Sequence, residues 1–496
     1  MYEIKNFTPR EYQTSILATA RNSNTLACLP TGTGKTKLAI MLLVERLNNY
    51  NESKAIIISP TKPLSSQITK EIEECTNIPA SKLTLLTGAI SPKERAELFQ
   101  NAQVIVATPQ TIQFDVENNR ISLEDTSILI VDECHRSKEK FANTQVARYY
   151  NEQAKNKLIL ALTASPGATK EKVTQVCSNL FIKNIELRTE EDADMAEHIQ
   201  DKISLNVKVA LPQELKKIQE ILKNHYKSKV SNLVKYGITK PSYAINKSDL
   251  LKYQFMFQKQ IKSGNFMAYR AISDIAEAIK VSHAVGLIET QTPKALHEYF
   301  IKLGQKSSKA SKNLLNNKLV ANAVKLTENL VNNNIKHPKM AKLKDILNEE
   351  FSKNPSMKAI IFANYRSTVN EIKQELAEVT NASPITLVGQ KDGLTQKEQI
   401  ETIEQFNKGL HNILICTSIG EEGLSIGSLD IAIFYDHTAS EIRKIQRSGR
   451  VARIRPGKII NLIAEKTLDE AMLWTAKRKE VKMHNLLNYM KRNLAK

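Results

Sequence analysis

The sequence has few cysteines, few aromatic residues and no long hydrophobic run. Its five cysteines are widely spaced and form no CxxC pair: Cys28, Cys75, Cys134, Cys177 and Cys416. An odd number of scattered cysteines argues against a disulfide framework, a zinc ribbon or an iron–sulfur cluster. This pattern favours a protein of a reducing compartment, the cytoplasm.

Stretches long enough to enter a membrane are also lacking. Apolar runs such as Ile56–Ile58 and Ile128–Val131 fall far short of the ~18 residues that a membrane span needs, and residues 1–10 contain no signal-peptide core. We expect no membrane partner and no secretion. With 41% hydrophobic and 25% charged residues, the chain is not disordered as a whole. At roughly 100 to 200 residues per domain, its length suggests about three domains.

Acidic residues are scarce in two parts of the chain. The full sequence has 71 Lys and Arg against 52 Asp and Glu, a formal net charge of +19. Residues 201–335 hold 22 basic and 9 acidic residues, residues 451–496 hold 11 and 4, and the remainder is nearly neutral. Such local surpluses are typical of surfaces that bind a polyanion. Lysine-rich helices with a merely solvated surface would have the same composition, so charge alone leaves both interpretations open.

Short apolar runs without alternation predict two α/β lobes, in residues 1–200 and 336–496. The runs alternate with helical patterns, as expected for buried parallel strands covered on both faces by helices. Residues 201–335 have few Gly or Pro and apolar spacings of three and four, which predicts a basic helical insert domain. We also expect a basic helical tail in the second lobe. The predicted strands are Leu26–Leu29, Ala55–Ile58, Val104–Ala107, Ile128–Val131, Leu158–Leu162, Ala359–Phe362, Ile413–Cys416, Ile431–Tyr435 and Ile459–Ile463.

A glycine-rich segment follows the first predicted strand and precedes a helical pattern, which is the context of a phosphate-binding (Walker A) loop. Gly32 and Gly34 would let backbone N–H groups approach phosphate oxygens. Lys35 would reach the β and γ phosphates of ATP, and the Thr36 hydroxyl would bind Mg²⁺. The predicted ATP-binding segment is Leu29, Pro30, Thr31, Gly32, Thr33, Gly34, Lys35 and Thr36.

Two consecutive carboxylates end another predicted strand. Asp132 and Glu133 directly follow the run Ile128–Val131, at the strand end where a site beside the phosphate loop would lie. Asp132 would hold Mg²⁺, and Glu133 would polarise the attacking water. We expect His135 to join a coupling network with the segment Thr163-Ala164-Ser165, which follows the next strand.

An arginine cluster lies on a predicted helix near the end of the second lobe. Arg450 and Arg453 fall within one turn of each other. Arginines on a second lobe can neutralise the charge of the γ phosphate when two lobes close, although a salt-bridged lobe interface is the alternative. The predicted catalytic residues are Lys35, Asp132, Glu133, Gln446, Arg450 and Arg453.

These three motifs, in this order and separated by a helical insert, resemble those of superfamily-two helicases and translocases, which have two RecA-like lobes. Two runs, Thr61-Lys62-Pro63-Leu64 and Gly420-Glu421-Glu422-Gly423-Leu424, are similar to archaeal Hef and its eukaryotic relatives FANCM and Mph. In the insert, Ser282-His283-Ala284 and Glu289-Thr290-Gln291 are similar to the thumb-like domain of that family. Further matching runs are Arg10-Glu11-Tyr12-Gln13, Ala107-Thr108-Pro109-Gln110-Thr111, Thr163-Ala164-Ser165-Pro166-Gly167 and Ile361-Phe362-Ala363-Asn364-Tyr365-Arg366.

The resemblance implies roles for further polar residues. Arg10 and Gln13 would contact adenine. The coupling residues would be His135, Thr163, Ser165, Glu422 and Gly423. The nucleic-acid track, in contact mostly with phosphates, would be lined by Thr61, Lys62, Gly88, Thr108, Gln110, Arg366 and Thr417.

Four positions depart from the family pattern. Leu29 stands at a possible glycine position, Ala452 replaces a usual glycine, and Ser425 stands where motif V has Asp. Cys134 makes the box Asp-Glu-Cys-His, a feature shared with RIG-I-like and Dicer helicases, which bind double-stranded RNA. RNA therefore stays open as a substrate.

The resemblance implies an ATP-driven and Mg²⁺-dependent DNA helicase or translocase that acts on forked or branched DNA in replication-fork repair. Its polarity would be 3′ to 5′ and, in an archaeon, it would be associated with the nucleoid. No nuclease motif is present, so we expect no strand incision by this chain, and a separate nuclease or a replication clamp is a candidate partner. Two alternatives are a RIG-I-like ATPase dependent on double-stranded RNA and an ATP-gated DNA-binding scaffold that does not unwind DNA.

Overall fold

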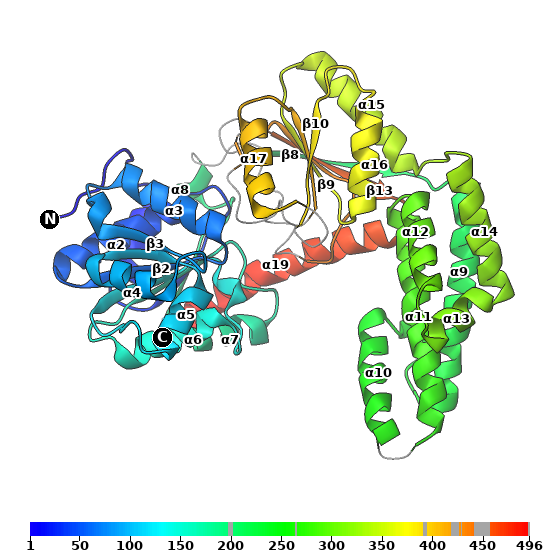
Figure 1. Cartoon of the computed structure of the whole chain (residues 1–496), viewed down its shortest axis with the longest axis horizontal. Helices are drawn as coiled ribbons and strands as arrows, with labels where there is room; N and C mark the ends of the chain where they lie inside the picture. The colour runs from blue at the N-terminus through cyan, green and yellow to red at the C-terminus, as the bar shows by residue number, and fades with distance from the viewer. Residues whose placement is uncertain are drawn as a thin grey trace.

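Figure 1 shows the computed structural model of the chain, in which two α/β lobes and a helical bundle are distinct bodies. It describes residues 1–196, 202–262, 265–389, 394–417, 426–427, 429–440 and 457–494. No helix within these ranges is long and apolar enough to cross a membrane. The residues discussed above that lie outside the ranges are Gly420, Glu421, Glu422, Gly423, Leu424, Ser425, Gln446, Arg450, Ala452 and Arg453.

Lobe 1 is built on a seven-stranded parallel sheet with the order β3-β4-β2-β5-β6-β1-β7. Helices cover both of its faces (Figure 1). The strands are β1 (Thr25–Cys28), β2 (Lys54–Ile58), β3 (Leu83–Leu86), β4 (Val104–Ala107), β5 (Thr126–Val131), β6 (Ile159–Thr163) and β7 (Asn184–Leu187). The helices are α1 (Glu11–Ala20), α2 (Lys35–Asn49), α3 (Lys62–Cys75), α4 (Pro92–Asn101), α5 (Pro109–Glu117), α6 (Ala142–Gln153), α7 (Lys170–Asn179) and α8 (Ala193–Ala196).

Successive side chains of these strands enter two different apolar cores, one on each face of the sheet. In β2, Ile56 and Ile58 pack into one core, whereas Ala55 and Ile57 pack into the other. A strand that is buried on both faces needs apolar residues at every position. The continuous apolar runs of the sequence therefore predicted five of the seven strands, β1, β2, β4, β5 and β6, whereas β3 and β7 are only partly buried and were not predicted.

Lobe 2 repeats this architecture with a six-stranded parallel sheet of order β10-β11-β9-β12-β13-β8. The predicted fold of two parallel-sheet lobes is thereby confirmed. The strands are β8 (Lys202–Val209), β9 (Ala359–Phe362), β10 (Pro384–Leu387), β11 (Ile413–Cys416), β12 (Ile431–Phe434) and β13 (Gly457–Ala464). The flanking helices are α15 (Pro338–Lys353), α16 (Arg366–Leu376) and α17 (Gln396–Asn407).

Strand β8 lies in the sheet of lobe 2, although the sequence assigned its residues to the helical insert. It pairs with β13 over its full length, from Lys202 opposite Gly457 to Val209 opposite Ala464. As an edge strand it is only partly covered, and Ile203 and Leu205 are 55% and 43% exposed. Its composition therefore lacks the continuous apolar run that identified the other strands.

The insert is a helical bundle that projects from lobe 2, away from lobe 1 (Figure 1). Its first apolar cluster joins the first helix to the later ones and continues into lobe 2 at Ala464 of β13, and a second cluster lies toward the far end of the bundle. Pro293 occupies the first turn of an insert helix, where the missing N–H has no cost. The helices are α9 (Gln213–Ser231), α10 (Lys247–Lys262), α11 (Met267–Thr290), α12 (Pro293–Gly304), α13 (Lys309–Asn316) and α14 (Lys318–Asn332).

The helix α19 (Leu468–Leu494) connects the two lobes (Figure 1). It begins beside lobe 2 and the insert, yet Met483 and Leu487 are fully buried in the core of lobe 1. Lys491 Nζ lies 2.8 Å from Glu186 Oε2 of β7. The sequence predicted the helical tail but assigned it to lobe 2 alone, because nothing in a local pattern specifies which distant core an apolar stripe enters.

A buried ion pair fixes the start of α19 to lobe 2. Lys339 Nζ lies 2.6 Å from Asp469 Oδ2 and also donates to the carbonyl of Tyr435 at 2.6 Å. Both charged side chains are 0% exposed. Burial raises the pKa of Asp469 to about 6, although Lys339 opposes this rise. A buried charge is tolerated only with such a partner.

We predict that Lys339→Met lowers the free energy of unfolding by about 3 to 5 kcal/mol, because it leaves Asp469 without its counter-charge. Urea denaturation, followed through the fluorescence of the single tryptophan, Trp474 in α19, measures this loss. The matched control is Lys353→Met on the same helix, which removes an exposed ion pair with Glu349 and should have little effect. Equal losses in both variants would contradict the prediction.

Candidate active site

The phosphate-loop segment joins β1 to α2 through two glycines in the left-handed region. Gly32 has φ of +81° and Gly34, the N-cap of α2, has φ of +77°. Lys35 Nζ donates to the carbonyls of Leu29 and Pro30, at 3.1 Å each. This geometry presents the backbone N–H groups at the N-terminus of α2 together with the Lys35 ammonium, an arrangement that favours the binding of an anion.

Helix α1 supports this loop through buried polar contacts. Tyr12 Oη donates to the carbonyl of Thr33, and Gln13 Nε2 donates to the carbonyl of Gly34 at 3.2 Å. Arg10 Nη1 in turn donates to Tyr12 Oη at 3.1 Å. The predicted contact of Arg10 and Gln13 with adenine stays a prediction. Sequence reasoning did not single out Tyr12, although it lies within the matching run.

The two predicted acidic residues follow β5, at the same edge of the sheet. Ser59 Oγ, at the end of the neighbouring β2, donates to Asp132 Oδ2 at 3.4 Å. Desolvation and the charge of Glu133 raise the pKa of Asp132 to about 7, while Lys35 opposes the rise. Glu133 has φ of +47°, a strained conformation for a residue with a side chain. The interaction of Asp132 with Lys35 brings the two motifs together.

The structure brings three of the predicted coupling residues into one chain of contacts. His135 Nδ1 lies 3.2 Å from Glu133 Oε2 and 3.3 Å from Thr163 Oγ1. The backbone N–H of Ser165 donates to the same Thr163 Oγ1 at 3.1 Å. These contacts link the loop after β6 to the carboxylate of Glu133, and the coupling role itself stays a prediction.

Two of the predicted nucleic-acid residues of lobe 1, Thr61 and Thr108, are the N-cap residues of helices at the same edge. Thr61 Oγ1 accepts from the N–H of Leu64 at the start of α3, next to Lys62, and Thr108 is the N-cap of α5. Gly88 and Gln110 line one surface cavity of about 630 Å³.

Arg95, which the sequence reasoning did not single out, lines the same cavity. Its guanidinium donates to both carboxylate oxygens of Asp115, at 2.6 and 2.7 Å. It also donates to the carbonyl of Ile90, at 2.6 Å. Arg95 therefore ties the loop before α4 to helix α5.

In lobe 2, the two described candidates for the nucleic-acid track follow neighbouring strands. Arg366 begins α16, after β9, and its Nη2 donates to the carbonyl of Gly389 at 2.7 Å. Thr417 follows β11, and its N–H donates to the carbonyl of Leu387 at 3.2 Å. Strands β9 and β11 are paired in parallel, so both residues lie at one edge of the sheet.

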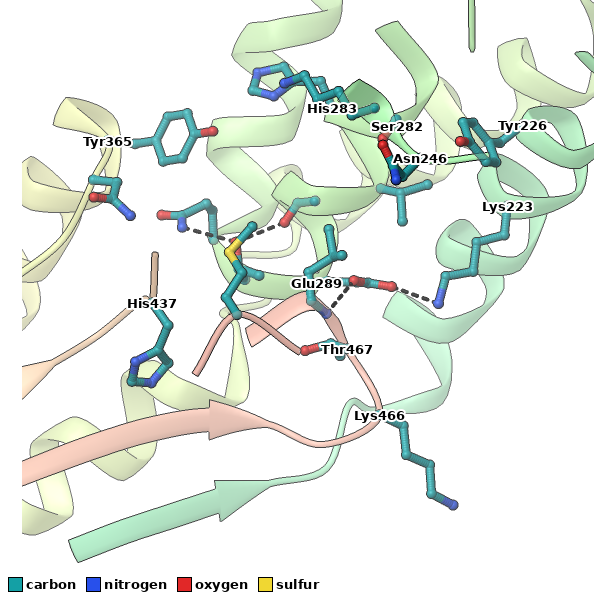
Figure 2. Close-up of a pocket in the computed structure, with 18 residues that line it drawn as sticks. Lys223, Tyr226, Asn246, Ser282, His283, Glu289, Tyr365, His437, Lys466 and Thr467 are labelled. Carbon is teal, nitrogen blue, oxygen red and sulfur yellow. Dashed lines mark hydrogen bonds and ion pairs between the residues drawn. The ribbon is translucent and has the colours of Figure 1, made fainter. Parts of the chain in front are cut away.

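A cavity of about 530 Å³ lies where the insert meets lobe 2 and the start of α19. Figure 2 shows Lys223 extending toward the carboxylate of Glu289, with His283 and Tyr365 on the opposite wall. The buried Glu289 accepts from Lys223 Nζ at 2.7 Å and from the N–H of Leu468 at 2.9 Å. Burial, and to a lesser degree Lys247, lower the pKa of His283.

Both insert runs that resemble the thumb-like domain reach this cavity. Ser282, His283 and Glu289 line it, as does Gln291, which also bridges the insert to lobe 2. Gln291 Nε2 donates to Asp436 Oδ2 at 2.9 Å, and its Oε1 accepts from Thr368 Oγ1 at 2.9 Å. No local sequence pattern shows that these runs meet lobe 2 here, because the junction is formed by residues far apart in the chain.

Comparisons with known families agree with this arrangement. Residues 10–176 match the DEAD/DEAH box helicase domain, and residues 338–455 match the helicase conserved C-terminal domain. Residues 214–337 match a helical bundle described from a putative ATP-dependent RNA helicase. The fold and site therefore define a superfamily-two helicase.

Individual relatives narrow the family further. The helicase domain of Pyrococcus furiosus Hef is 38% identical, with a TM-score of 0.71 over 94% of this chain and 98% of that one. A putative ATP-dependent RNA helicase of Methanocaldococcus jannaschii is 35% identical over 98% of this chain, and the ATP-dependent DNA helicase mph1 of Neurospora crassa is 31% identical over 92%. The chain belongs to the Hef, FANCM and Mph group of ATP-dependent helicases. It spans 61% and 41%, respectively, of the lengths of the latter two relatives.

We predict that Gly34→Ala weakens nucleotide binding roughly tenfold or more, from the cost of a strained backbone alone. A Cβ at residue 34 would lie 2.7 Å from Gln13 Nε2, so the Gln13 amide would have to leave the loop carbonyl. Titration with a fluorescent ADP analogue measures the affinity. The control is Gly237→Ala in the insert, where φ is +83° and nothing lies within 4 Å of the added Cβ. Parental affinity in Gly34→Ala would refute the prediction.

Proposed function

We propose that this chain is an ATP-driven motor that translocates on, or remodels, forked or branched DNA. The observation that carries the proposal is the approach of the Lys35 loop to the Asp132–Glu133 pair at one edge of the lobe 1 sheet. This is the arrangement that ATP hydrolysis requires in two-lobed motors. The DNA helicases among the relatives, and the basic insert beside lobe 2, support nucleic acid as the track.

The residues present suit a Mg²⁺ ion. Asp132 and the Thr36 hydroxyl would offer oxygen ligands, the type that this hard cation prefers. The raised pKa of Asp132 indicates a carboxylate with too little positive charge nearby, since Lys35 only partly offsets its desolvation. When bound, Mg²⁺ would supply positive charge against the β and γ phosphates.

Different residues of the site would then have different roles in ATP hydrolysis. The N–H groups of the loop and Lys35 would hold the phosphates, as the helix N-terminus favours anions. Glu133 would orient and polarise the attacking water. His135, whose Nδ1 lies 3.2 Å from Glu133 Oε2 and 3.3 Å from Thr163 Oγ1, would keep that carboxylate in position.

The nucleic acid would cross the insert–lobe 2 junction. Lys247 on α10 and Lys466 before α19 are exposed and line the cavity there, as does Tyr365, which precedes the candidate track residue Arg366 in the chain. Residues 201–335, with 22 basic and 9 acidic residues, would hold a duplex arm by contacts to phosphates. A separate nuclease or a replication clamp is the partner that we propose for such a motor.

The test of this proposal is the rate of ATP hydrolysis at fixed salt with no nucleic acid, single-stranded DNA, duplex DNA, forked DNA and duplex RNA. Forked DNA should stimulate hydrolysis most. Strongest stimulation by duplex RNA would replace the proposal with a double-stranded RNA-dependent ATPase. No stimulation by any of them would favour an ATP-gated scaffold.

We predict that the double variant Lys247→Glu with Lys466→Glu binds forked DNA more weakly. Its rate of ATP hydrolysis in the absence of nucleic acid should equal that of the parent chain. The slope of log K against log salt should become shallower by roughly one for each lysine that meets a phosphate. The control is Lys408→Glu, an exposed lysine between α17 and β11, at the opposite edge of the lobe 2 sheet. An unchanged slope in the double variant would remove this junction from the DNA path.

We also predict that Glu133→Gln keeps nucleotide affinity and lowers kcat for ATP by about 10² or more, since the amide cannot polarise water as the carboxylate does. Lys35→Ala should instead lose nucleotide binding. Glu139→Gln, at an exposed position a few residues on, is the matched control and should keep the parental rate. Robust hydrolysis by Glu133→Gln would refute its assigned role.

A further inference from the structure

The C-terminal helix contacts the loop that leads to the catalytic carboxylate. Ser165 Oγ, after β6 of lobe 1, donates to Met483 Sδ of α19 at 2.8 Å. Ser165 is 2% exposed and Met483 is 0% exposed, so the contact is shielded from water. Met483 belongs to the apolar core of lobe 1, yet it is carried by a helix that starts at lobe 2.

The other end of α19 is held by contacts with the insert and lobe 2. The N–H of Leu468 donates to Glu289 of the insert at 2.9 Å, and Asp469 forms the buried ion pair with Lys339 of α15. Further along, Lys479 Nζ donates to the carbonyl of Ala439 in lobe 2 at 2.7 Å. If lobe 2 and the insert move, the start of α19 therefore moves with them.

Between these anchors the helix is mostly solvent-exposed, although Ala476 is buried. Trp474 and Val481 are 48% and 54% exposed, so this stretch is not held by a core of its own. An uninterrupted helix of 27 residues is about 40 Å long and resists bending. A displacement of lobe 2 would therefore be transmitted along the helix to Met483.

From Met483 a short run of polar contacts reaches Glu133. The N–H of Ser165 donates to Thr163 Oγ1, which lies 3.3 Å from His135 Nδ1. His135 lies 3.2 Å from Glu133 Oε2. Each step is a direct contact within hydrogen-bonding distance.

We propose that Met483 is a positioning residue for ATP hydrolysis, which holds the Ser165 loop, and through it His135 and Glu133, according to the position of lobe 2. Lobe 2 would then influence Glu133 through α19, which is part of the same chain. This influence would add to that of the contacts between the lobes across the nucleotide cleft. It rests on the proposed role of Glu133. A sulfur acceptor explains why a hydroxyl is buried at this point, since a purely apolar neighbour would leave Ser165 Oγ without this bond.

The test compares two volume-conserving exchanges on one face of α19. Met483→Leu keeps the packed volume but removes the sulfur atom that accepts from Ser165. Leu487→Met, one helical turn further on, keeps the packed volume and leaves the Met483 sulfur in place. We expect Met483→Leu to lower kcat for ATP about threefold or more with KM for ATP unchanged, while the unpaired Ser165 hydroxyl lowers the melting temperature by only about a few degrees. Leu487→Met should keep the parental kcat. Rates are measured with and without forked DNA.

Ser165→Ala completes a double-mutant cycle. If the contact carries the effect, the double variant Met483→Leu with Ser165→Ala should be no slower than Ser165→Ala alone. Parental kcat in Met483→Leu, additive losses in the double variant, or an equal loss in Leu487→Met would each overturn the proposal.

The same data separate this inference from the proposed function. If no nucleic acid stimulates the parent chain, the DNA motor fails, while the rate without nucleic acid still tests the Met483–Ser165 contact. If Glu133→Gln retains hydrolysis, the assigned role of Glu133 fails and the proposed route loses its end point. An inactive Glu133→Gln together with a normal Met483→Leu overturns the inference alone.

Discussion

The buried ion pair between Lys339 and Asp469 is the interaction on which the arrangement of the three parts depends. Each charge would be costly alone, so the pair is stable only when α15 and the start of α19 are both in place. The next residue back, Leu468, donates its N–H to Glu289 of the insert. A few neighbouring atoms therefore fix lobe 2, the insert and the connecting helix relative to one another. Because the far half of that helix packs into lobe 1, the same contacts also fix the position of lobe 1.

Buried polar contacts serve the same purpose in lobe 1. The two sheets and their cores provide the stability, but apolar packing does not choose between nearby loop conformations. Tyr12 and Gln13 do so for the phosphate loop, because their polar groups are buried and satisfied only when the loop carbonyls meet them. Gln291 does the same at the junction of the insert and lobe 2, where it pairs with Asp436 and Thr368. The active site is thus positioned by hydrogen bonds on a rigid apolar frame.

The sequence predicted those features that are encoded locally. Strands such as β4 and β9 were found because both of their faces are buried, and the phosphate loop was found because its glycines have a fixed spacing. Strands β3, β7 and β10 have partly exposed faces and were not singled out, and β8 was assigned to the insert. The contacts of Arg95 with Asp115 and of Met483 with Ser165 join residues 20 and 318 positions apart, and no local pattern encodes such pairs.

The place of β8 has a mechanical consequence for the insert. The chain adds an edge strand to the lobe 2 sheet, leaves it for the helical bundle, and returns to the same sheet at β9, so the bundle interrupts lobe 2. Any rotation of lobe 2 against lobe 1 would carry the bundle with it. Since α10 lies at the far end of that bundle (Figure 1), a small rotation of the lobe becomes a larger linear displacement there, as at the tip of a lever.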